Sequence, residues 1–234
     1  MQVFYSYKIA DNNAVFDPEE SQHGVKVLRL RKGSKIYFTD GVGNMYEGEI
    51  TSDDFRKMEA RIISVTRGYG KREYSLHMAV SPLKNHDRFE WFIEKAVEMG
   101  IDEITPLICE RTEKQTVKSE RLRKLIISAM KQSVKSYLPC LHEPAPFNLF
   151  VNRPLSDTKI IAHCSNIFQR DPITSIIERG KNITILVGPE GDFSESEIEN
   201  AVSHGFRSVS LGESRLRTET AGIVACCSSY LANI

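Results

Sequence analysis

Two short loops in the last third of the chain combine residue types that suit ligand binding. Residues 189–194 (PEGDFS) follow an apolar run that ends at Gly188, and residues 213–220 (ESRLRTET) follow another that ends at Gly212. Glycines let a backbone approach a ligand closely and present N–H and C=O groups to it. Arg217 adds a planar guanidinium, which suits a substrate oxygen or a phosphate. The loops therefore predict a binding or catalytic site that is built largely from backbone.

The two loops also allow simpler interpretations. Neither has the glycine spacing of a dinucleotide-binding or P-loop motif, so both would also serve as tight turns between a strand and a helix. Thr218 or Thr220 would then cap the final helix, while Arg217 and Glu219 form a surface ion pair worth about 0–1 kcal/mol. If the site binds a nucleoside, the apolar side chains available to enclose adenine are Leu186, Leu211 and Leu216.

The elements that position these loops are predicted, from residue 73 onward, as alternating strands and helices. Apolar runs typical of strands lie at residues 74–82, 103–109, 159–164, 182–188 and 208–212. Helical spacing of apolar residues lies at residues 87–100, 119–136, 194–205 and in the final segment. Strands that alternate with helices imply βαβ units and a mostly parallel sheet.

Local signals support this division into elements. Asp87 is the expected N-cap of the first helix, and Ser194 with Glu197 forms a capping-box pattern before the third. In open α/β sheets, ligands bind beyond the carboxyl ends of the strands. Both loops lie at such ends. His163 lies at another, where a lone histidine is more often structural.

Residues 1–70 follow a different pattern, one of short strands separated by turns. Two strand-like runs flank the glycine-rich turn at residues 40–44 and predict a β-hairpin. Glycines and charged residues at 68–72 interrupt the pattern and mark a domain boundary. The chain is thus expected to have a small, mostly β domain over residues 1–70 and an α/β domain over residues 73–234.

Composition places the 234-residue chain among ordinary globular proteins, with 41% hydrophobic and 26% charged residues. This balance excludes disordered and fibrous classes. No apolar stretch reaches the roughly 18–20 residues of a membrane-spanning helix, and the start of the chain lacks a signal-peptide core. The five cysteines contain no C-x-x-C pair, which argues against zinc and disulfides and favours a reducing cytoplasm. We expect a soluble, cytoplasmic protein with no metal and no membrane partner.

The net charge of zero, from 31 basic and 31 acidic residues, conceals two basic segments. Residues 26–35 carry five basic residues and no acidic one, and residues 111–135 carry eight basic residues against two acidic ones. Such segments suit a protein that contacts phosphate with one face. A solvated helix face is the simpler alternative.

The two loops carry a resemblance to a known family. The segment ILVGPEGDFSESEIENAVSHGF followed by SLGESRLRTETA resembles the signature of the bacterial ribosomal RNA small-subunit methyltransferase E family, which belongs to the SPOUT (trefoil-knot) class. The pairing of GPEG with LGxxxLRTETA at this separation is highly specific. Further matches cover most of the chain, among them residues 23–29, 98–101, 104–107 and 129–133.

The resemblance implies a PUA-like β-barrel that helps to bind RNA, followed by a knotted α/β methyltransferase domain. It implies S-adenosylmethionine as the cofactor and N3 of one uridine in the decoding region of 16S ribosomal RNA as the methyl acceptor. The implied partner is the assembled small ribosomal subunit, and the implied quaternary state is a homodimer. The final helix, which is apolar on more than one side, is compatible with that state.

The family's cofactor contacts map onto Leu186, Gly188, Pro189, Glu190, Gly191, Leu211, Gly212, Ser214 and Leu216. Because N3 of uracil carries a proton, a cation beside O2 or O4 would stabilise the anion that forms when the proton leaves. Arg217 is expected to have this role, and Glu219 is the candidate general base. The residues expected to bind RNA are Arg29, Arg31, Lys32, Arg121, Arg123, Lys131, Gln132 and Lys135.

Two other functions remain open. A related SPOUT methyltransferase would act on another nucleotide or RNA, since cofactor loops are easier to recognise than substrate choice. A non-catalytic RNA-binding or assembly factor would keep the fold without binding S-adenosylmethionine. A nucleotide-hydrolysing enzyme is disfavoured, because the chain has no phosphate-binding lysine motif and no metal-binding carboxylate pair.

Overall fold

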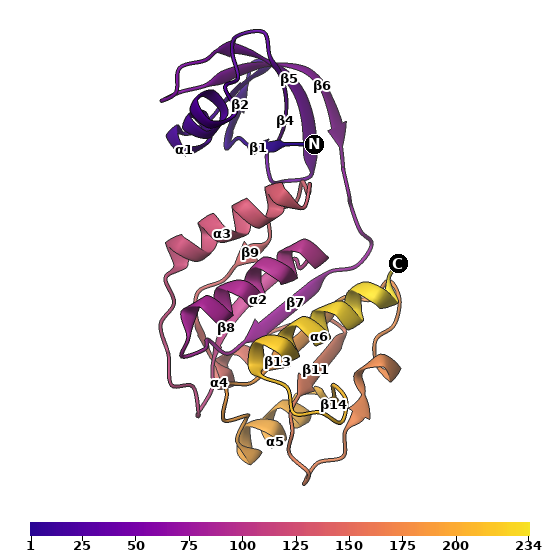
Figure 1. The fold of residues 1–234 in the computed structure, drawn as a ribbon. Helices are drawn as coiled ribbons and strands as arrows, with labels where there is room; N and C mark the ends of the chain where they lie inside the picture. Colours follow the sequence, from indigo (N-terminus) through magenta and orange to yellow (C-terminus); the bar gives the residue numbers. More distant parts are fainter. The chain divides into compact units, whose positions relative to one another are not determined.

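The computed structural model describes all residues, 1–234, and divides into two compact units. Unit 1 consists of Met1–Lys71 and Ile127–Leu138, and unit 2 consists of Arg72–Ile126 and Pro139–Ile234. Figure 1 follows the chain from the indigo strands of unit 1 to the yellow final helix of unit 2. The chain thus passes into unit 2, returns to unit 1 for one segment, and leaves again. None of the helices combines the length and hydrophobicity needed to cross a bilayer.

Unit 1 is built on a six-stranded sheet in the order β1-β4-β5-β6-β3-β2. Its strands are β1 (Val3–Tyr5), β2 (Lys8–Ala10), β3 (Asn13–Val15), β4 (Lys35–Thr39), β5 (Asn44–Ser52) and β6 (Glu59–Arg67). All neighbours are antiparallel except β1 and β4, which run parallel. The expected hairpin is present as β4 and β5. Two register shifts along β5 increase the local twist and let the sheet curl.

The core of unit 1 is a cluster of aromatic and aliphatic side chains. Phe16 packs edge-on against Phe4 and Phe38, with ring centroids 5.9 and 5.4 Å apart. Helix α1 (Pro18–Gln22) is joined to β1 by Glu20, whose Oε2 accepts a hydrogen bond from the N–H of Tyr5 at 3.1 Å, and it continues into a π-helical turn, η1 (His23–Val27). The aromatic pairs add to the burial that stabilises this small unit.

The returning segment, Ile127–Leu138, is held to unit 1 by close backbone contacts. The carbonyl of Ser136 accepts a hydrogen bond from the N–H of Gly43 at 2.9 Å. Gly43 has a φ of 102°, and a Cβ there would lie 2.4 Å from the ring of Tyr137. Only glycine permits this approach. The carboxyl end of helix α3 (Ser119–Gln132) is therefore part of unit 1.

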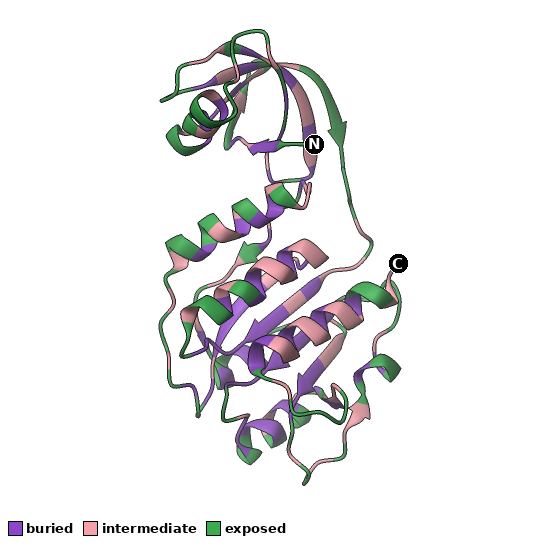
Figure 2. Ribbon diagram, viewed as in Figure 1, coloured by how far each residue is buried: buried purple, intermediate pink, exposed green.

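Unit 2 is built on a parallel sheet in the order β10-β8-β7-β13-β11-β14-β12, with β9 also paired to β8. Its strands are β7 (Leu76–Val80), β8 (Glu103–Ile108), β9 (Cys140–Leu141), β10 (Ala145–Pro146), β11 (Thr158–Ala162), β12 (Asp171–Pro172), β13 (Ile183–Val187) and β14 (Arg207–Ser210). Every pairing is parallel, as the alternating pattern predicted. The central strands β7 and β13 are buried almost throughout (Figure 2).

Helices cover both faces of this sheet. They are α2 (His86–Met99), α4 (Phe147–Val151), α5 (Glu195–Ser203), α6 (Thr218–Ala232) and the short 3-10 helix η2 (Ile173–Ser175). On one face α2 packs against α6, which lies on β7 and β13. At Gly222 of α6, a Cβ would lie 2.7 Å from the ring of Phe92, so the two helices approach too closely for a larger residue. On the other face α4 and α5 share a core with Ile161 and Leu186.

The ends of the helices differ in part from the expected ones. The side chain of Asn85 accepts a hydrogen bond from the N–H of Asp87, so α2 begins before the expected N-cap. Helix α3 ends at Gln132 rather than near 136, because Val134 has a left-handed backbone with a φ of 56°. The capping box of Ser194 and Glu197 is confirmed at the start of α5.

Candidate active site

Three neighbouring strands of the unit 2 sheet end side by side, and a loop follows each of them. β11 ends at Ala162, β13 at Val187 and β14 at Ser210, in the spatial order β13-β11-β14. The three loops, with the first turns of α2 and α6, enclose a cavity of about 450 Å³. Small-molecule sites typically have volumes of about 300–1,000 Å³. The cavity is therefore large enough for a nucleoside-sized ligand.

Seven of the nine residues expected to bind the cofactor line this cavity: Gly188, Pro189, Glu190, Leu211, Gly212, Ser214 and Leu216. The structure does not bring the other two there. Leu186 is fully buried within β13, in the core beneath α4 and α5. Gly191 contacts Arg111, whose Nη1 donates a hydrogen bond to the glycine carbonyl at 2.8 Å. Of the three apolar side chains expected to enclose adenine, Leu211 and Leu216 therefore line the cavity and Leu186 does not.

The first loop, residues 188–194, is fixed by backbone N–H groups that donate hydrogen bonds to the carboxylate of Asp192. Asp192 has a left-handed backbone, with a φ of 62°. Its side chain accepts hydrogen bonds from the N–H groups of Cys164 and Phe193, both at 2.8 Å. The bond from Cys164 joins this loop to the one that follows β11. Such fixed loops reduce the entropy that a ligand must overcome on binding.

The second loop, residues 211–217, leads directly into α6. Arg217 occupies the N-cap position with an extended backbone, and no side chain caps the helix. Neither Thr218 nor Thr220 is the N-cap as expected, because the helix already begins at Thr218. Arg217 is exposed at the cavity, where no carboxylate pairs with it. Glu219 is instead buried, with Oε1 at 3.7 Å from Nε of Arg88 on α2, so the expected surface pair is absent.

His163 is the most unusual polar residue of the cavity. The residue is only 5% exposed, and neither ring nitrogen has a hydrogen-bond partner. The ring packs edge-on against Phe168, and burial lowers the pKa of the imidazole. Buried polar groups without partners are rare and costly. A ligand in the cavity that hydrogen-bonds to His163 would remove that cost.

Other residues that line the cavity were not expected individually to bind cofactor or to take part in catalysis. They are Arg88, Ala162, Cys164, Arg170, Val187, Asp192, Ser210, Arg215, Thr218 and Ala221. Most belong to the same strand ends and loops, so the strand pattern locates them once the loops are identified. Arg88 comes from α2, far away in the sequence, and only the packing of α2 on α6 brings it to the site.

The residues expected to bind RNA are divided between the two units. Unit 1 contains Arg29, Arg31, Lys32, Lys131, Gln132 and Lys135, and unit 2 contains Arg121 and Arg123. Arg121 pairs with Glu90 at 2.7 Å, and Arg123 pairs with Glu143 at 3.3 Å. Both guanidiniums therefore already have a carboxylate partner.

Within unit 1 the basic residues differ in their availability. Lys131 forms an ion pair with the buried Glu20, which ties the carboxyl end of α3 to α1. Arg31 donates hydrogen bonds to backbone carbonyls of its own segment. Arg29 and Lys32 are exposed. Of these four candidates, Arg29 and Lys32 are the best placed to contact a phosphate.

Comparison with known proteins points to one family. A family model described as an RNA methyltransferase domain matches residues 71–229, and one described as an RNA methyltransferase PUA domain matches residues 16–63. The crystal structure of a probable rRNA-methyltransferase from Porphyromonas gingivalis is 34% identical, with a TM-score of 0.93, and covers 100% of this chain and 98% of that one.

Two further relatives carry a specific name. The ribosomal RNA small subunit methyltransferase E of Neisseria gonorrhoeae, solved bound to S-adenosyl methionine, is 27% identical, with a TM-score of 0.81, and covers 100% of this chain and 98% of that one. The protein of the same name from Bacillus subtilis is 27% identical over 219 residues, which are 88% of this chain and 85% of the relative.

These matches confirm the expected fold class, a SPOUT-type α/β methyltransferase domain with a small PUA-like domain before it. They also confirm that the chain is an enzyme of the RNA methyltransferase type. The methyltransferase-domain match spans well over half of the chain, and the named relatives match nearly its whole length. The chain therefore belongs to the bacterial ribosomal RNA small subunit methyltransferase E family of RNA methyltransferases.

Proposed function

We propose that this enzyme uses S-adenosylmethionine to methylate N3 of one uridine in the decoding region of 16S ribosomal RNA. The observation that carries the proposal is the convergence of the two signature loops on one cavity, with Arg217 exposed beside it. The named relatives support the ribosomal substrate. The names of these relatives specify neither the uridine nor its N3 atom, which are added by the proposal.

The residues around the cavity fit S-adenosylmethionine. Leu211 and Leu216 supply apolar surface for adenine, and a Cβ at Gly212 would meet no atom within 4 Å, so the backbone there faces open space. His163 offers two buried ring nitrogens that lack partners. When bound, this cofactor supplies an electrophilic methyl group on a sulfonium centre. The work of the protein is therefore to hold donor and acceptor in line.

Activation of the acceptor requires groups beside the uracil ring. N3 becomes nucleophilic when its proton leaves, and the unpaired guanidinium of Arg217 would stabilise the resulting charge on O2 or O4. Among the carboxylates of the cavity, Glu190 accepts the N–H of Lys84, and Asp192 accepts two backbone N–H groups. Glu219 has no such backbone bond, so it is the candidate to accept the N3 proton.

The target base must be unpaired for the reaction, because N3 takes part in Watson–Crick pairing. Phosphate contacts from Arg29 and Lys32 would hold the RNA while the base is exposed. The double variant Arg29→Ala/Lys32→Ala is expected to weaken RNA binding. The slope of log K against the logarithm of the salt concentration should become shallower by about 1–2. Lys181→Ala, which removes an exposed charge from unit 2, is the control. If this slope is unchanged in the double variant, Arg29 and Lys32 are solvated surface residues that do not contact phosphate.

We also propose that the enzyme is a homodimer and that its methyltransferase domain has the trefoil knot of the SPOUT class. It acts in the cytoplasm, where ribosomal subunits are assembled. The end of α6 carries the exposed apolar side chains Tyr230 and Leu231, which suit contact with a second copy. Sedimentation at micromolar concentration tests the dimer. A single monomeric species would remove that part of the proposal.

The decisive experiment is transfer of label from methyl-labelled S-adenosylmethionine. Small ribosomal subunits that lack this modification, and naked 16S RNA, are used as parallel substrates and then digested to nucleosides. We expect label in 3-methyluridine, and more of it from subunits than from naked RNA. Label in another nucleoside would keep the enzyme class and overturn the substrate atom. Cofactor binding without any transfer would overturn the proposed substrate.

A further inference from the structure

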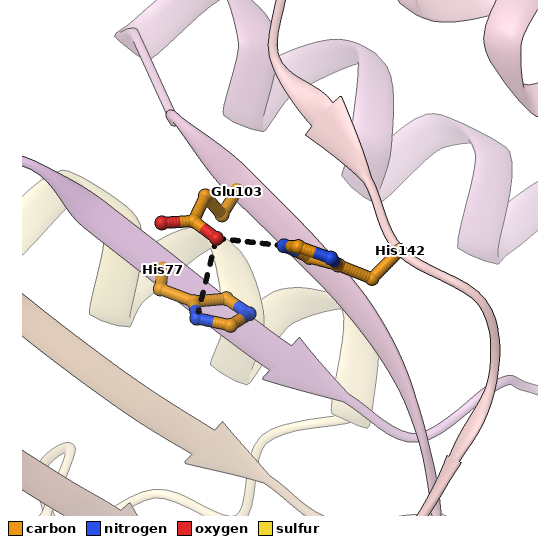
Figure 3. A group of neighbouring side chains, drawn as sticks. All are labelled: His77, Glu103 and His142. Atoms are coloured by element: carbon orange, nitrogen blue, oxygen red, sulfur yellow. Dashed lines mark hydrogen bonds and ion pairs between the residues drawn. The ribbon is translucent and has the colours of Figure 1, made fainter. Parts of the chain in front are cut away.

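A second polar cluster lies at the opposite, amino-terminal edge of the unit 2 sheet (Figure 3). It consists of His77 on β7, Glu103 on β8 and His142, which directly follows β9. None of the three belongs to the candidate active site, and the two family-signature loops lie at the other ends of the strands. The cluster therefore requires its own explanation.

The register of the sheet brings these three side chains together. In the parallel ladder His77 pairs with Glu103, and Glu103 pairs with Cys140 on the next strand. Residues paired in this way project from the same face of a sheet. His142 follows two residues after Cys140 and so projects from that face as well. Three positions that are far apart in the sequence thus form one row across three neighbouring segments.

The donor atoms of the cluster are close enough to share one ion. All three ligand atoms lie within 4.8 Å of one another. Oε2 of Glu103 lies 2.6 Å from Nε2 of His142 and 3.9 Å from Nδ1 of His77. Ligands at zinc distances of about 2.0–2.2 Å in a tetrahedron lie about 3.3 Å apart. Reaching that arrangement requires the Glu103–His142 pair to separate by about 0.7 Å and the Glu103–His77 pair to close by about 0.6 Å.

A further contact orients the least exposed ligand. Nε2 of His77 lies 2.8 Å from the hydroxyl of Thr105, which is fully buried. When Nε2–H donates to that hydroxyl, the lone pair of Nδ1 faces Glu103. Phe150 packs edge-on against the same imidazole, with ring centroids 5.3 Å apart. Metal-binding histidines generally have such a partner on the second ring nitrogen, which fixes the tautomer and the ring plane.

We propose that His77, Glu103 and His142 bind one Zn²⁺ ion, with the fourth coordination position open to solvent. Two imidazoles and one carboxylate are a ligand set that Zn²⁺ favours, whereas Mg²⁺ and Ca²⁺ prefer oxygen ligands alone. A cavity of about 360 Å³ adjoins the cluster and gives an ion and a bound water access to it. Arg153, which carries a positive charge, lines this cavity too. Glu103 must therefore supply the negative charge that attracts the cation.

The bound ion would act as a cross-link within unit 2. It would join β7, β8 and the segment after β9 at the edge of the sheet. A ligand that binds only the folded state stabilises that state in proportion to the logarithm of its concentration over its dissociation constant, once it is in excess. The proposal is independent of methyl transfer, because its test measures metal binding and thermal stability alone.

The test uses the full chain after removal of metals with a chelator. Titration with Co²⁺ is expected to produce visible absorption bands of a tetrahedral site with one equivalent bound, and Zn²⁺ is expected to abolish them by displacement. Zn²⁺ should also raise the midpoint of thermal unfolding. Circular dichroism of each variant checks that it is folded before metal is added.

Variants locate the ion. His142→Ala and Glu103→Gln, both at partly exposed side chains, are each expected to weaken Co²⁺ binding at least 100-fold. Thr105→Val, which keeps the shape but removes the hydroxyl, should weaken it about 10-fold, as for other outer contacts to metal ligands. Cys164→Ser, which removes an exposed thiol outside the cluster, should leave it unchanged.

Three results would overturn the proposal. The first is the absence of saturable Co²⁺ binding by the wild-type chain. The second is binding that persists unaltered in folded Glu103→Gln and His142→Ala. The third is an intense thiolate-to-metal charge-transfer band that disappears in Cys140→Ser or Cys164→Ser, because it would assign the ion to cysteine.

Discussion

The two edges of the unit 2 sheet each hold a polar site, and the sites are built in opposite ways. At the carboxyl edge, the cavity is lined mainly by loops whose residues are continuous in sequence. At the amino edge, His77, Glu103 and His142 come from separate segments and meet only through strand register. A loop can change without disturbing the sheet, whereas a strand residue is fixed by its neighbours. The carboxyl edge thus suits a ligand that enters and leaves, and the amino edge suits an ion that stays.

The largest expected effect tests whether the carboxyl edge performs chemistry. Arg217→Ala should lower kcat for methyl transfer at least about 100-fold, as loss of a group that stabilises developing charge does elsewhere. The affinity for S-adenosylmethionine should change little, because the arginine is placed for the acceptor. Single-turnover transfer and calorimetric cofactor binding measure the two effects. Arg207→Ala, on a guanidinium paired with Asp171 outside the cavity, is the control, and equal losses in both variants would contradict the assigned role.

A second change tests whether the loop backbone at this edge is shaped for its ligand. A Cβ at Gly188 would lie 3.1 Å from the ring and 3.2 Å from the N–H nitrogen of the buried Phe193. Gly188→Ala should therefore destabilise the fold by about 1–3 kcal/mol through overpacking, and it should weaken cofactor binding. Urea unfolding and calorimetry check both expectations.

Gly191→Ala provides a matched control in the same loop. A Cβ there meets only the side chain of Arg111, at 3.4 Å, which is ordinary contact. We expect its free energy of unfolding to lie close to that of the wild type. If the two alanine variants behave alike, the close approach at Gly188 is not what shapes the loop.

At the amino edge a smaller effect is expected when no metal is present. The hydrogen bond between Glu103 and His142 joins side chains that are 42% and 35% exposed. Glu103→Gln in metal-free protein should therefore cost only about 0–1 kcal/mol of unfolding free energy. Chemical denaturation with and without Zn²⁺ measures this. A cost well above that range without metal would mean that the cluster stabilises the sheet by itself, and the contrast between the edges would be weaker.

The last expected effect is confined to acidic pH and concerns His163. Burial lowers the pKa of this imidazole in the folded state, while the unfolded chain takes up the proton near pH 6.5. Above that pH both states are neutral, so His163 contributes no pH dependence. Below it the unfolded state binds more protons, and stability falls as the pH falls, by at most about 1.4 kcal/mol per pH unit. His163→Gln should flatten this part of the profile, measured by urea unfolding between pH 7 and pH 5. An unchanged slope would exclude His163 as its source.

The contrast between the edges also explains what could be predicted from sequence. The glycines of the first loop and the residues around Arg217 form contiguous motifs, so the amino-acid sequence alone placed their site at the carboxyl ends of the strands. Leu186 does not line the cavity because side chains alternate along β13, and register decides which face each one takes. The partner of Glu219 could not be anticipated either, since Arg88 reaches it only through helix packing.

The amino-edge cluster could not be predicted from the sequence either, because strand register brings its residues together. Metal motifs are recognised by short spacings, as in C-x-x-C pairs, and the expectation of no metal rested on their absence. His77, Glu103 and His142 have no such spacing. Only the ladder that pairs His77 with Glu103 places them in one row.

The return of the chain to unit 1 has a consequence for how the protein is made. Ser136 supplies the carbonyl that binds Gly43 and Thr39, and Lys131 pairs with Glu20. A nascent chain that ends near residue 71 lacks all of these contacts. Unit 1 therefore cannot complete its structure until translation has passed Leu138, after the first part of unit 2, Arg72–Ile126, has been synthesised. A truncated fragment of residues 1–71 would be an incomplete piece rather than an autonomous module, so studies of RNA binding by unit 1 need the whole chain.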